Sequence, residues 1–422
     1  MSSTADLPAS PTLSHVLDNG LTVLGEPMPW LRTAAFSLCL PAGVQLETDQ
    51  HAGLSGLVCE MVQRGAGHRN SRDLVADQDN LGMDRSAGVS TAHASFGAAM
   101  PAESLAEGLA MYADIVRRPH LPADQLEDAQ AVALQELRAV EDEPTQRVIT
   151  RLKTLHYGPT LGRSVYGSQA GIESITSSHI RDFYTQHYQP SGAILAIAGN
   201  FSWRETLEQV NELWGNWQAK PQPPAPSFIS QPAVYEHIDH ASQQTHIAFA
   251  CPAVPYEHPD YFAFRAGVGI LSDGMSSRLF DRVREQRGLC YSVSASCHSL
   301  LGTGGLFGYA GTTVERAQET LDVTLAEVQA IVQGVDADEL RRLKVRVQSN
   351  LIMEQESSAS RASSMVSDWY HLGRVMSAAE LEQRIEAITS DQIVRYWTEQ
   401  PLRDFRIVTL GPAPLQVPAE TV

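Results

Sequence analysis

The chain contains an internal duplication, which restricts its possible folds more than any other feature. The segment Ile175–Tyr184 reads Ile-Thr-Ser-Ser-His-Ile-Arg-Asp-Phe-Tyr, and it recurs 213 residues later as Ile388–Trp397, Ile-Thr-Ser-Asp-Gln-Ile-Val-Arg-Tyr-Trp. An apolar, strand-like segment follows each copy, Ile194–Gly199 after the first and Phe405–Gly411 after the second. Echoes that keep the same order indicate one domain that has been duplicated.

A second pair of echoes supports this division and locates its boundary. Ala123-Asp-Gln-Leu126 is matched by Ala337-Asp-Glu-Leu340, and both open long helical stretches. Between the halves, residues 218–232 contain the run Lys-Pro-Gln-Pro-Pro-Ala-Pro-Ser, a composition typical of a stiff linker. A chain of 422 residues also exceeds one ordinary core. We therefore predict an N-terminal domain over 13–217 and a C-terminal domain over 233–415.

Strand-like and helix-like segments alternate within each half. An Asp-Asn-Gly turn between apolar segments predicts a hairpin over 16–24. The other strand and helix signals of the first half lie at 33–40 and 89–98 for strands, and at 103–117, 122–142 and 177–186 for helices. Hairpin-paired strands with helices packed on one face make an α+β unit. The predicted fold class is thus α+β, with two homologous domains, each built on a mostly antiparallel sheet.

A helix with a buried face is predicted over His51–Arg64. Its apolar residues follow the i, i+3, i+4, i+7 spacing: Leu54, Leu57, Val58 and Met61. Gly65 supplies the stop. The string from Ala52 to Ala66 resembles the active-site helix of the M16 (pitrilysin/insulinase-like) zinc peptidases, which carries the inverted zinc motif His-x-x-Glu-His. In that register the first His is replaced by Gly56, the catalytic Glu by Cys59 and the second His by Glu60.

The chemistry of the motif shows what these replacements remove. Two His at i and i+4 can hold one zinc ion, and the Glu between them acts as general base on the zinc-bound water. The resemblance implies a third ligand, a Glu, about 76 residues after the second His, and Glu136 occupies that position. An acidic residue usual seven positions before that ligand is replaced by Ala129. One of three ligands therefore survives, and the base is missing.

A rebuilt metal site would have to use Cys59, Glu60 and Glu136. Hydrolytic zinc sites normally include at least one imidazole, and neither His51 nor His68 lies one helical turn from Glu60. Cys59 also points about 100° away from Glu60 around a helix. A nucleophilic Cys59 has no identifiable base, and a helical Cys is more often a packing residue. We therefore expect no zinc in this chain, with an altered metal site as the alternative reading.

The second half carries a different signature, Ser272–Ser294, which predicts a helix ending at Gly288 and then a strand. It resembles the C-terminal M16 signature, in which an Arg and a Tyr seven residues apart meet the substrate. Arg284 and Tyr291 match those positions. An Arg can donate to peptide carbonyls, and a Tyr hydroxyl can donate to the oxyanion of a tetrahedral intermediate. Without the resemblance, a solvated helix-end Arg and a core Tyr would be the ordinary interpretations.

The resemblance covers about residues 13 to 412 and implies two six-stranded units. In heterodimeric bacterial M16 peptidases one subunit carries the zinc motif and the other carries the Arg/Tyr pair. This chain matches the second kind, so we expect a zinc-bearing homologous partner, unfolded oligopeptides as substrate, and no activity of the chain alone. A homodimer of the isolated chain stays open. So does a scaffold role, because the core subunits of the cytochrome bc1 complex resemble this fold.

Composition excludes several other classes of protein. A net charge of -18 disfavours nucleic acid and anionic membranes as partners, and no apolar run reaches the length of a membrane span. Five scattered cysteines favour a reducing compartment over a disulfide framework. The first eleven residues lack the regions of a signal peptide. We therefore expect a cytoplasmic protein. The Gly-rich run 301–308 lacks the Lys-Ser/Thr of a phosphate loop and predicts a hairpin.

Overall fold

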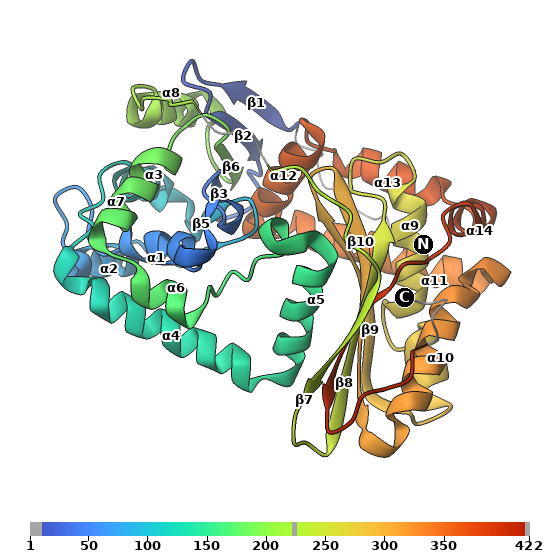
Figure 1. Ribbon diagram of the computed structural model, residues 1–422. Helices are drawn as coiled ribbons and strands as arrows, with labels where there is room; N and C mark the ends of the chain where they lie inside the picture. Colours follow the sequence, from blue (N-terminus) through green and yellow to red (C-terminus); the bar gives the residue numbers. More distant parts are fainter. Residues whose placement is uncertain (1–10, 222–225, 418–422) are drawn as a thin grey trace. The chain divides into compact units, whose positions relative to one another are not determined.

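The computed structural model describes residues 11–221 and 226–417, which form two compact units (Figure 1). The first unit comprises the described residues of three segments: Met1–Leu137, Arg163–Pro226 and Leu351–Ala378. The second comprises those of Arg138–Gly162, Ser227–Asn350 and Ala379–Val422. Each unit thus includes a segment from the opposite half of the sequence. The expectation for the N-terminal residues 1–10 and part of the expected linker, 222–225, lie outside the described residues.

The first unit is built on a six-stranded sheet with the order β1-β2-β6-β3-β5-β4. Its strands are β1 (Leu13–Val16), β2 (Thr22–Pro27), β3 (Thr33–Leu40), β4 (Asp84–Val89), β5 (Ala94–Pro101) and β6 (Ile194–Gly199). All neighbours pair antiparallel except β2 and β6. The predicted hairpin and the strand over 33–40 are confirmed. The α+β fold class with mostly antiparallel sheets is confirmed as well.

The strand predicted over 89–98 is wrong, because the chain turns within it. Residue 89 ends β4, and β5 begins only at residue 94. Between them the backbone N–H of Ser90 donates to the His93 carbonyl at 2.8 Å, and the N–H of His93 donates to Ser90 Oγ at 3.1 Å. A serine that bonds to its neighbouring backbone favours a turn over continued pairing. The predicted single strand is therefore two strands of one hairpin.

Helices of the first half cover one face of this sheet. They are α1 (Leu54–Met61), α2 (Ser71–Asn80), α3 (Leu105–Arg117), α4 (Leu126–Asp142), α6 (Gln169–Ser174), α7 (Ser177–His187) and α8 (Trp203–Trp214). Side chains alternate between the two faces of a strand. Accordingly Phe36 and Leu38 of β3 join the core beneath these helices, whereas Cys39 joins a separate core on the opposite face.

The second unit has a sheet of five described strands in the order β7-β11-β8-β10-β9. They are β7 (Val234–Asp239), β8 (Gln244–Ala253), β9 (Cys290–Leu300), β10 (Thr303–Thr313) and β11 (Arg406–Gly411). The second sheet therefore has one strand fewer than the six that the resemblance implied. The Gly-rich run forms the turn between β9 and β10, where Gly302 has a positive φ of 75°. The predicted glycine-rich hairpin is confirmed.

Helices of the second half are α9 (Tyr261–Ser272), α10 (Ala317–Gln329), α11 (Ala337–Gln355), α13 (Ala378–Ala387) and α14 (Ser390–Glu399). The repeated Ile-Thr-Ser motif proves to be a helix start. Thr176 caps α7 and Thr389 caps α14, each as part of a capping box. In the second box the backbone N–H of Thr389 donates to Gln392 Oε1 at 2.9 Å. The duplicated sequence thus encodes a capped helix that leads into a buried strand, β6 or β11.

The other face of each sheet is covered by one helix from the opposite half of the sequence (Figure 1). Helix α5 (Pro144–Leu161) packs on β8 and β11, and α12 (Ser358–Leu372) packs on β3 and β6. Val148 and Leu152 of α5 are fully buried, as is Met365 of α12. The prediction of helices on one face therefore describes only the larger helical layer of each sheet. Strands β6 and β11 are buried along their whole length, so both faces of each sheet are apolar and need to be covered.

A buried ion pair fixes α12 to the first sheet. Arg361 Nε donates to Glu26 Oε2 at 2.8 Å, and the two residues are 7% and 9% exposed. Breaking such a pair leaves an uncompensated charge, which costs about 3–5 kcal/mol.

None of the described helices has both the length and the apolar character that crossing a membrane requires.

Candidate functional site

Helix α1 begins on a buried carboxylate. The N-cap residue Gly53 has a left-handed φ of 108°. Glu47 Oε2 accepts the backbone N–H of Gly53 at 2.9 Å, and its Oε1 accepts that of Ser55 at 2.7 Å. Burial raises the pKa of Glu47 to about 7, against the lowering effect of these hydrogen bonds and of Arg163. Leu57, on the predicted apolar face, is 1% exposed. Glu47 therefore fixes the start of α1, and the buried apolar face fixes one side of the helix.

The three motif positions on α1 cannot replace the missing zinc ligands. A Cβ built on Gly56 would meet only ordinary contacts, at 3.8 Å or more, so hydrogen here is not imposed by packing. Cys59 is 4% exposed, its thiol donates to the Gly88 carbonyl at 3.8 Å, and burial raises its pKa to about 12. Glu60 is half-exposed and paired with Arg64, Nε to Oε1, at 3.0 Å. A thiol with this pKa is not a nucleophile near neutral pH.

The surviving ligand position does not restore the site. Glu136 of α4 is exposed, whereas Ala129, about two turns before it, is 1% exposed. Arg64 also donates to the Gln125 carbonyl at 3.4 Å and so links the end of α1 to the start of α4. Within 11–221 and 226–417, no three His, Cys, Asp or Glu residues gather closely enough to hold a metal ion. The residues at this site do not fit a catalytic zinc ion.

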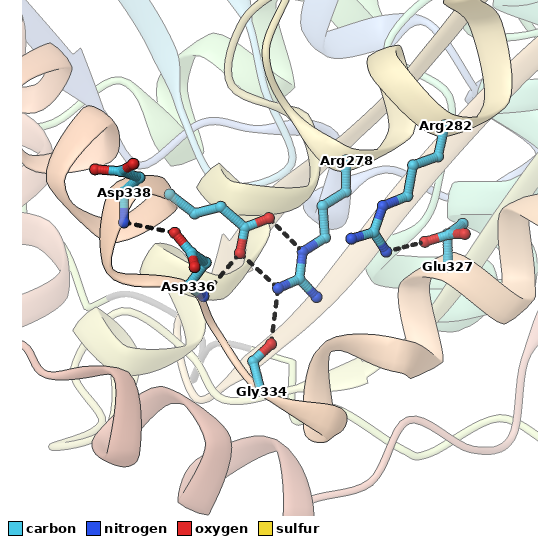
Figure 2. A network of polar contacts seen from close by, with 7 residues as sticks. Arg278, Arg282, Glu327, Gly334, Asp336 and Asp338 are labelled. Atoms are coloured by element: carbon cyan, nitrogen blue, oxygen red, sulfur yellow. Dashed lines mark hydrogen bonds and ion pairs between the residues drawn. The ribbon is translucent and has the colours of Figure 1, made fainter. Parts of the chain in front are cut away.

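The signature of the second half folds into a helix that is anchored by two arginines (Figure 2). Its last turns, Phe280–Glu285, are π-helical, and π-helical turns often occur at functional sites. Arg278 Nε and Nη2 donate to the two carboxylate oxygens of Glu339 at 2.7 and 2.6 Å. One turn further, Arg282 Nη1 donates to Glu327 Oε2 at 2.8 Å. Arg278 is 7% exposed, so this is a buried, bidentate anchor.

Arg284 takes part in neither anchor and is partly exposed. Its side chain is 42% exposed, stacks over the Phe280 ring at 4.6 Å and lies 3.7 Å from Glu285 Oε1. The helix ends as predicted at Gly288, which has a positive φ of 59° and whose N–H donates to the Arg284 carbonyl. A stacked guanidinium retains free N–H groups for a ligand.

Tyr291 lies at a β-bulge in the hairpin of β9 and β10. Gly311 faces Ser292 and Thr312 faces Cys290, so Tyr291 has no partner in β10. Bulges redirect a side chain and are frequent next to active sites. Tyr291 is 51% exposed, and its hydroxyl donates to Gln244 Oε1 at 3.1 Å. The core interpretation of this Tyr is therefore wrong.

A set of polar residues around Tyr291 was not found from the sequence. A Cβ on Gly311 would come within 2.6 Å of Tyr291 Oη and 2.8 Å of Tyr309 Oη, so both hydroxyls need this glycine. Tyr309 Oη in turn lies 2.8 Å from His246 Nδ1 and 3.1 Å from Thr145 Oγ1. Burial lowers the pKa of His246 and raises that of Tyr309, so both are neutral at pH 7. The signal available in the sequence was the polar start of an otherwise apolar strand, Gln244 and His246 of β8.

The two sites differ in what they can do chemically. The first offers a buried thiol and an ion-paired carboxylate, and neither activates water. The second offers a fixed guanidinium and a phenol held by neutral neighbours. These groups can donate hydrogen bonds to carbonyl oxygens and stabilise developing negative charge, but they cannot supply a base.

Two models of one family match the chain in succession. The model described as insulinase (peptidase family M16) matches residues 23–169, and that of the peptidase M16 inactive domain matches residues 174–346. Together they include α1 and both candidate residues of the second signature, Arg284 and Tyr291. The family relationship thus extends over both halves of the duplication.

Relatives and solved structures agree with these matches. A Rickettsia felis protein named an uncharacterized zinc protease is 25% identical over 90% of this chain and 92% of its own length. The uncharacterized zinc protease YmxG of Bacillus subtilis is 23% identical over 94% and 98%. A peptidase M16 inactive domain from Pseudomonas fluorescens superimposes with a TM-score of 0.87 at 20% identity, covering 97% of this chain and 99% of that one. A Helicobacter pylori protease gives 0.88 at 17% identity, over 96% and 100%. With both halves matched and the fold shared, the chain is a member of the M16 peptidase family.

Proposed function

We propose that this chain is the zinc-less subunit of a two-subunit M16 peptidase. A homologous partner would hold the zinc ion and the general base. This chain would contribute Arg284 and Tyr291 to the binding of an unfolded oligopeptide in a closed chamber. Its five cysteines are unpaired in the structure, which suits the cytoplasm as its location.

The observation that carries the proposal is the position of Tyr291. A tyrosine kept only for packing would be buried and paired in the ladder, whereas this one is half-exposed on a bulge with its hydroxyl held by Gln244. Maintaining that position requires a glycine at 311. Packing alone does not explain an exposed tyrosine that depends on a glycine in the neighbouring strand. The recognition of a carbonyl or an oxyanion by its hydroxyl does.

The site on α1, which does not fit a zinc ion, supports the proposal that the partner subunit holds the metal. Cys59 and Glu60 remove the base and a ligand, yet the apolar face of α1 and the Glu47 cap are in place. The loss is limited to the groups that would do chemistry. A subunit that relies on a partner's metal needs the packing of this helix and none of its ligands.

In this assignment each residue has one task. The Arg284 guanidinium donates to a carbonyl oxygen of the bound peptide and fixes its register. The Tyr291 hydroxyl exchanges its bond to Gln244 for one to the oxygen that becomes negative as the scissile carbonyl is attacked. A donor aimed at developing charge stabilises the transition state more than the ground state.

The test is reconstitution. The purified chain should not hydrolyse an unstructured fluorogenic oligopeptide in the presence of zinc, whether it is a monomer or a homodimer. Mixed with a zinc-bearing M16 homologue from the same organism, it should form a complex that does. Hydrolysis by the chain alone that is lost on chelation would overturn the proposal and favour an altered metal site.

A second comparison separates this role from a scaffold role. Arg284→Ala should lower the turnover of the complex without changing its assembly. Arg287→Ala, an exposed arginine of the same segment, is the matched control and should have no effect. Equal turnover of Arg284→Ala and the wild type would indicate a purely structural subunit.

A further inference from the structure

A continuous line of hydrogen-bonding groups runs from the interior of the second unit to Tyr291. His246 of β8 and Tyr309 of β10 are both buried. Tyr309 Oη lies 2.8 Å from His246 Nδ1 and 3.1 Å from Thr145 Oγ1, and a further hydrogen bond joins it to the Tyr291 hydroxyl. Tyr291 ends the line at the surface, where its hydroxyl donates to Gln244 Oε1 at 3.1 Å. The buried side chains are out of reach of a substrate, so they can act only through these bonds.

The number of hydrogen atoms in this line fixes its direction. A tyrosine hydroxyl has one hydrogen to donate and two lone pairs that accept. Tyr291 donates its hydrogen to Gln244 Oε1, which can only accept, so the bond between the two tyrosines needs the hydrogen of Tyr309. Tyr309 then has no hydrogen left for His246. Their contact of 2.8 Å is therefore a hydrogen bond only if the imidazole carries its own hydrogen on Nδ1.

The surroundings of Tyr309 agree with this direction. Its hydroxyl donates once, to Tyr291, and accepts twice, from the imidazole and from Thr145, so its full capacity is used. Burial is the main cause that raises the pKa of Tyr309; the bond with Thr145 lowers this pKa, and the bond with Tyr291 raises it. A phenol that accepts a hydrogen bond ionises more easily, and one that must keep its hydrogen to donate ionises less easily. The two directions therefore match the assigned roles.

We propose that His246 is held as the Nδ1–H tautomer, and that His246 and Tyr309 are positioning residues for Tyr291. The imidazole donates to Tyr309, Tyr309 donates to Tyr291, and the last hydrogen of the line points outward. Hydrogen bonds in such a chain polarise one another, so each donor strengthens the next. When a peptide oxygen replaces Gln244, the Tyr291 hydroxyl is already directed at it. This inference rests on the proposed role of Tyr291 in substrate binding.

The opposite direction would place the hydrogen of Tyr291 out of reach of a substrate. If the Gln244 amide presented its nitrogen to Tyr291, the phenol would donate inward to Tyr309. Tyr309 would donate in turn to a bare Nδ1 of His246, whose hydrogen would then lie on Nε2. The two directions therefore differ in an observable property, the tautomer of His246.

The first test is this tautomer in the isolated chain. Nitrogen-15 NMR of the chain labelled at histidine distinguishes a ring nitrogen that carries hydrogen from a bare one, and the signal missing from His246→Asn identifies this residue. We expect Nδ1 to carry the hydrogen near neutral pH, and an Nε2–H tautomer would overturn the inference. Because the measurement needs no partner, zinc or peptide, its outcome is separate from that of the reconstitution.

The second test determines whether Tyr309 acts through Tyr291. In the reconstituted complex, Tyr309→Phe should lower kcat roughly tenfold with an unchanged KM, the size of one lost hydrogen bond. In a Tyr291→Phe background the same change should have no further effect. Tyr235→Phe is the matched control and should leave kcat unchanged, because its hydroxyl also bonds within the second sheet, but to Thr409 at 3.0 Å. An equal loss in both backgrounds would show that Tyr309 only supports the fold.

Two substitutions of similar size separate a donor at position 246 from packing there. In His246→Asn the amide nitrogen lies close to the former Nδ1 and can donate to Tyr309, whereas the side chain of His246→Leu fills similar space without a donor. His246→Asn should retain most of kcat, and His246→Leu should lose about as much as Tyr309→Phe. Equal kcat of the two variants would show that the imidazole only fills space.

Discussion

Helix α1 of the first unit and the signature segment of the second unit differ in the exposure of their candidate reactive side chains. On α1 the former reactive positions are closed: Cys59 is buried, and Glu60 is bound to Arg64. In the second unit the anchor Arg278 is buried, whereas the two residues proposed to bind substrate, Arg284 on the helix and Tyr291 on β9, are both about half-exposed. Packing is kept in both helices, so the difference lies in which side chains are left free.

Two glycines make the same contrast. Gly56 has room for a side chain, because the nearest atoms to an added Cβ are 3.8 Å away. Gly311 has none, since an added Cβ would meet the Tyr291 hydroxyl at 2.6 Å. The first glycine leaves space where the resemblance implies a ligand. The second supports the position of Tyr291, which we propose binds substrate.

The largest effect is expected from the anchor of the second helix. Arg278→Ala leaves Glu339 without its partner in a site where that carboxylate is 16% exposed, which should lower the free energy of unfolding by about 3–5 kcal/mol. Urea denaturation followed by circular dichroism measures the change. Arg282→Ala removes a pair whose arginine is 41% exposed and should cost less. Equal effects of the two would contradict the assignment of Arg278 as the main anchor.

Tyr291→Phe tests the proposed role of the exposed tyrosine in the second unit. In the reconstituted complex it should lower kcat by about 10²-fold, as is usual when one oxyanion donor is removed. The unfolding midpoint should hardly change, because the ring is half-exposed. Gly311→Ala should reproduce much of this loss by displacing the hydroxyl. A variant with normal kcat and a displaced or missing hydroxyl would remove Tyr291 from the mechanism.

The pH dependence of stability tests the cap of α1. Glu47 has a pKa of about 7 in the folded chain against an ordinary value of 4.5. Between these values the folded state binds a proton that the unfolded state lacks, so its contribution to stability is full below pH 4.5 and is lost as the pH rises through 7. The expected size is on the order of 3 kcal/mol.

Glu47→Gln isolates this contribution from other titrating groups. Burial lowers the pKa of His93 to about 4, which acts in the opposite direction: stability is lost as the pH falls below 6.5. The difference in the free energy of unfolding between the wild type and Glu47→Gln should therefore change with pH between 4.5 and 7 and be constant above pH 7. If this difference is constant over the whole pH range, the pKa of Glu47 is not raised and the prediction is wrong.

The smallest effect is expected at Gly56. Gly56→Ala adds a side chain into available space and reduces the freedom of the unfolded chain. It should raise the free energy of unfolding by about 0.5–1 kcal/mol. Thermal denaturation at several scan rates is sensitive enough to detect it. A loss of stability would mean that the glycine is needed by α1, and the contrast with Gly311 would disappear.

Much of this architecture could be predicted from local sequence signals. The spacing of Leu54, Leu57, Val58 and Met61 gave the buried face of α1, and Gly65, with its positive φ of 103°, marks the end of the turns that follow it. The duplicated Ile-Thr-Ser motif marked two capped helices. Arg284 and Tyr291 were found through the family resemblance, and the local hint of the surroundings of Tyr291 was the polar start of β8.

What the sequence did not reveal depends on pairing at long range. The bulge at Tyr291 exists only because β9 and β10 change register between Gly311 and Thr312. The partners of its hydroxyl come from β8, far away in the chain. The Ser90 turn was missed because its flanking residues alternate like a strand. The assignment of α5 and α12 to opposite sheets has no sequence signature, since any amphipathic helix could cover either apolar face.

The exchange of α5 and α12 has a consequence for biosynthesis. When the first half of the chain leaves the ribosome, the outer face of its sheet is bare, since α12 is made more than 150 residues after β6. Meanwhile α5 has no sheet to cover until β8 and β11 exist. Long-range contacts of this kind slow folding and expose apolar surface that can aggregate. If the chain were divided at the Pro-rich segment, each sheet would lose the helix that covers one of its apolar faces, so we expect the two halves to fold only as parts of one chain.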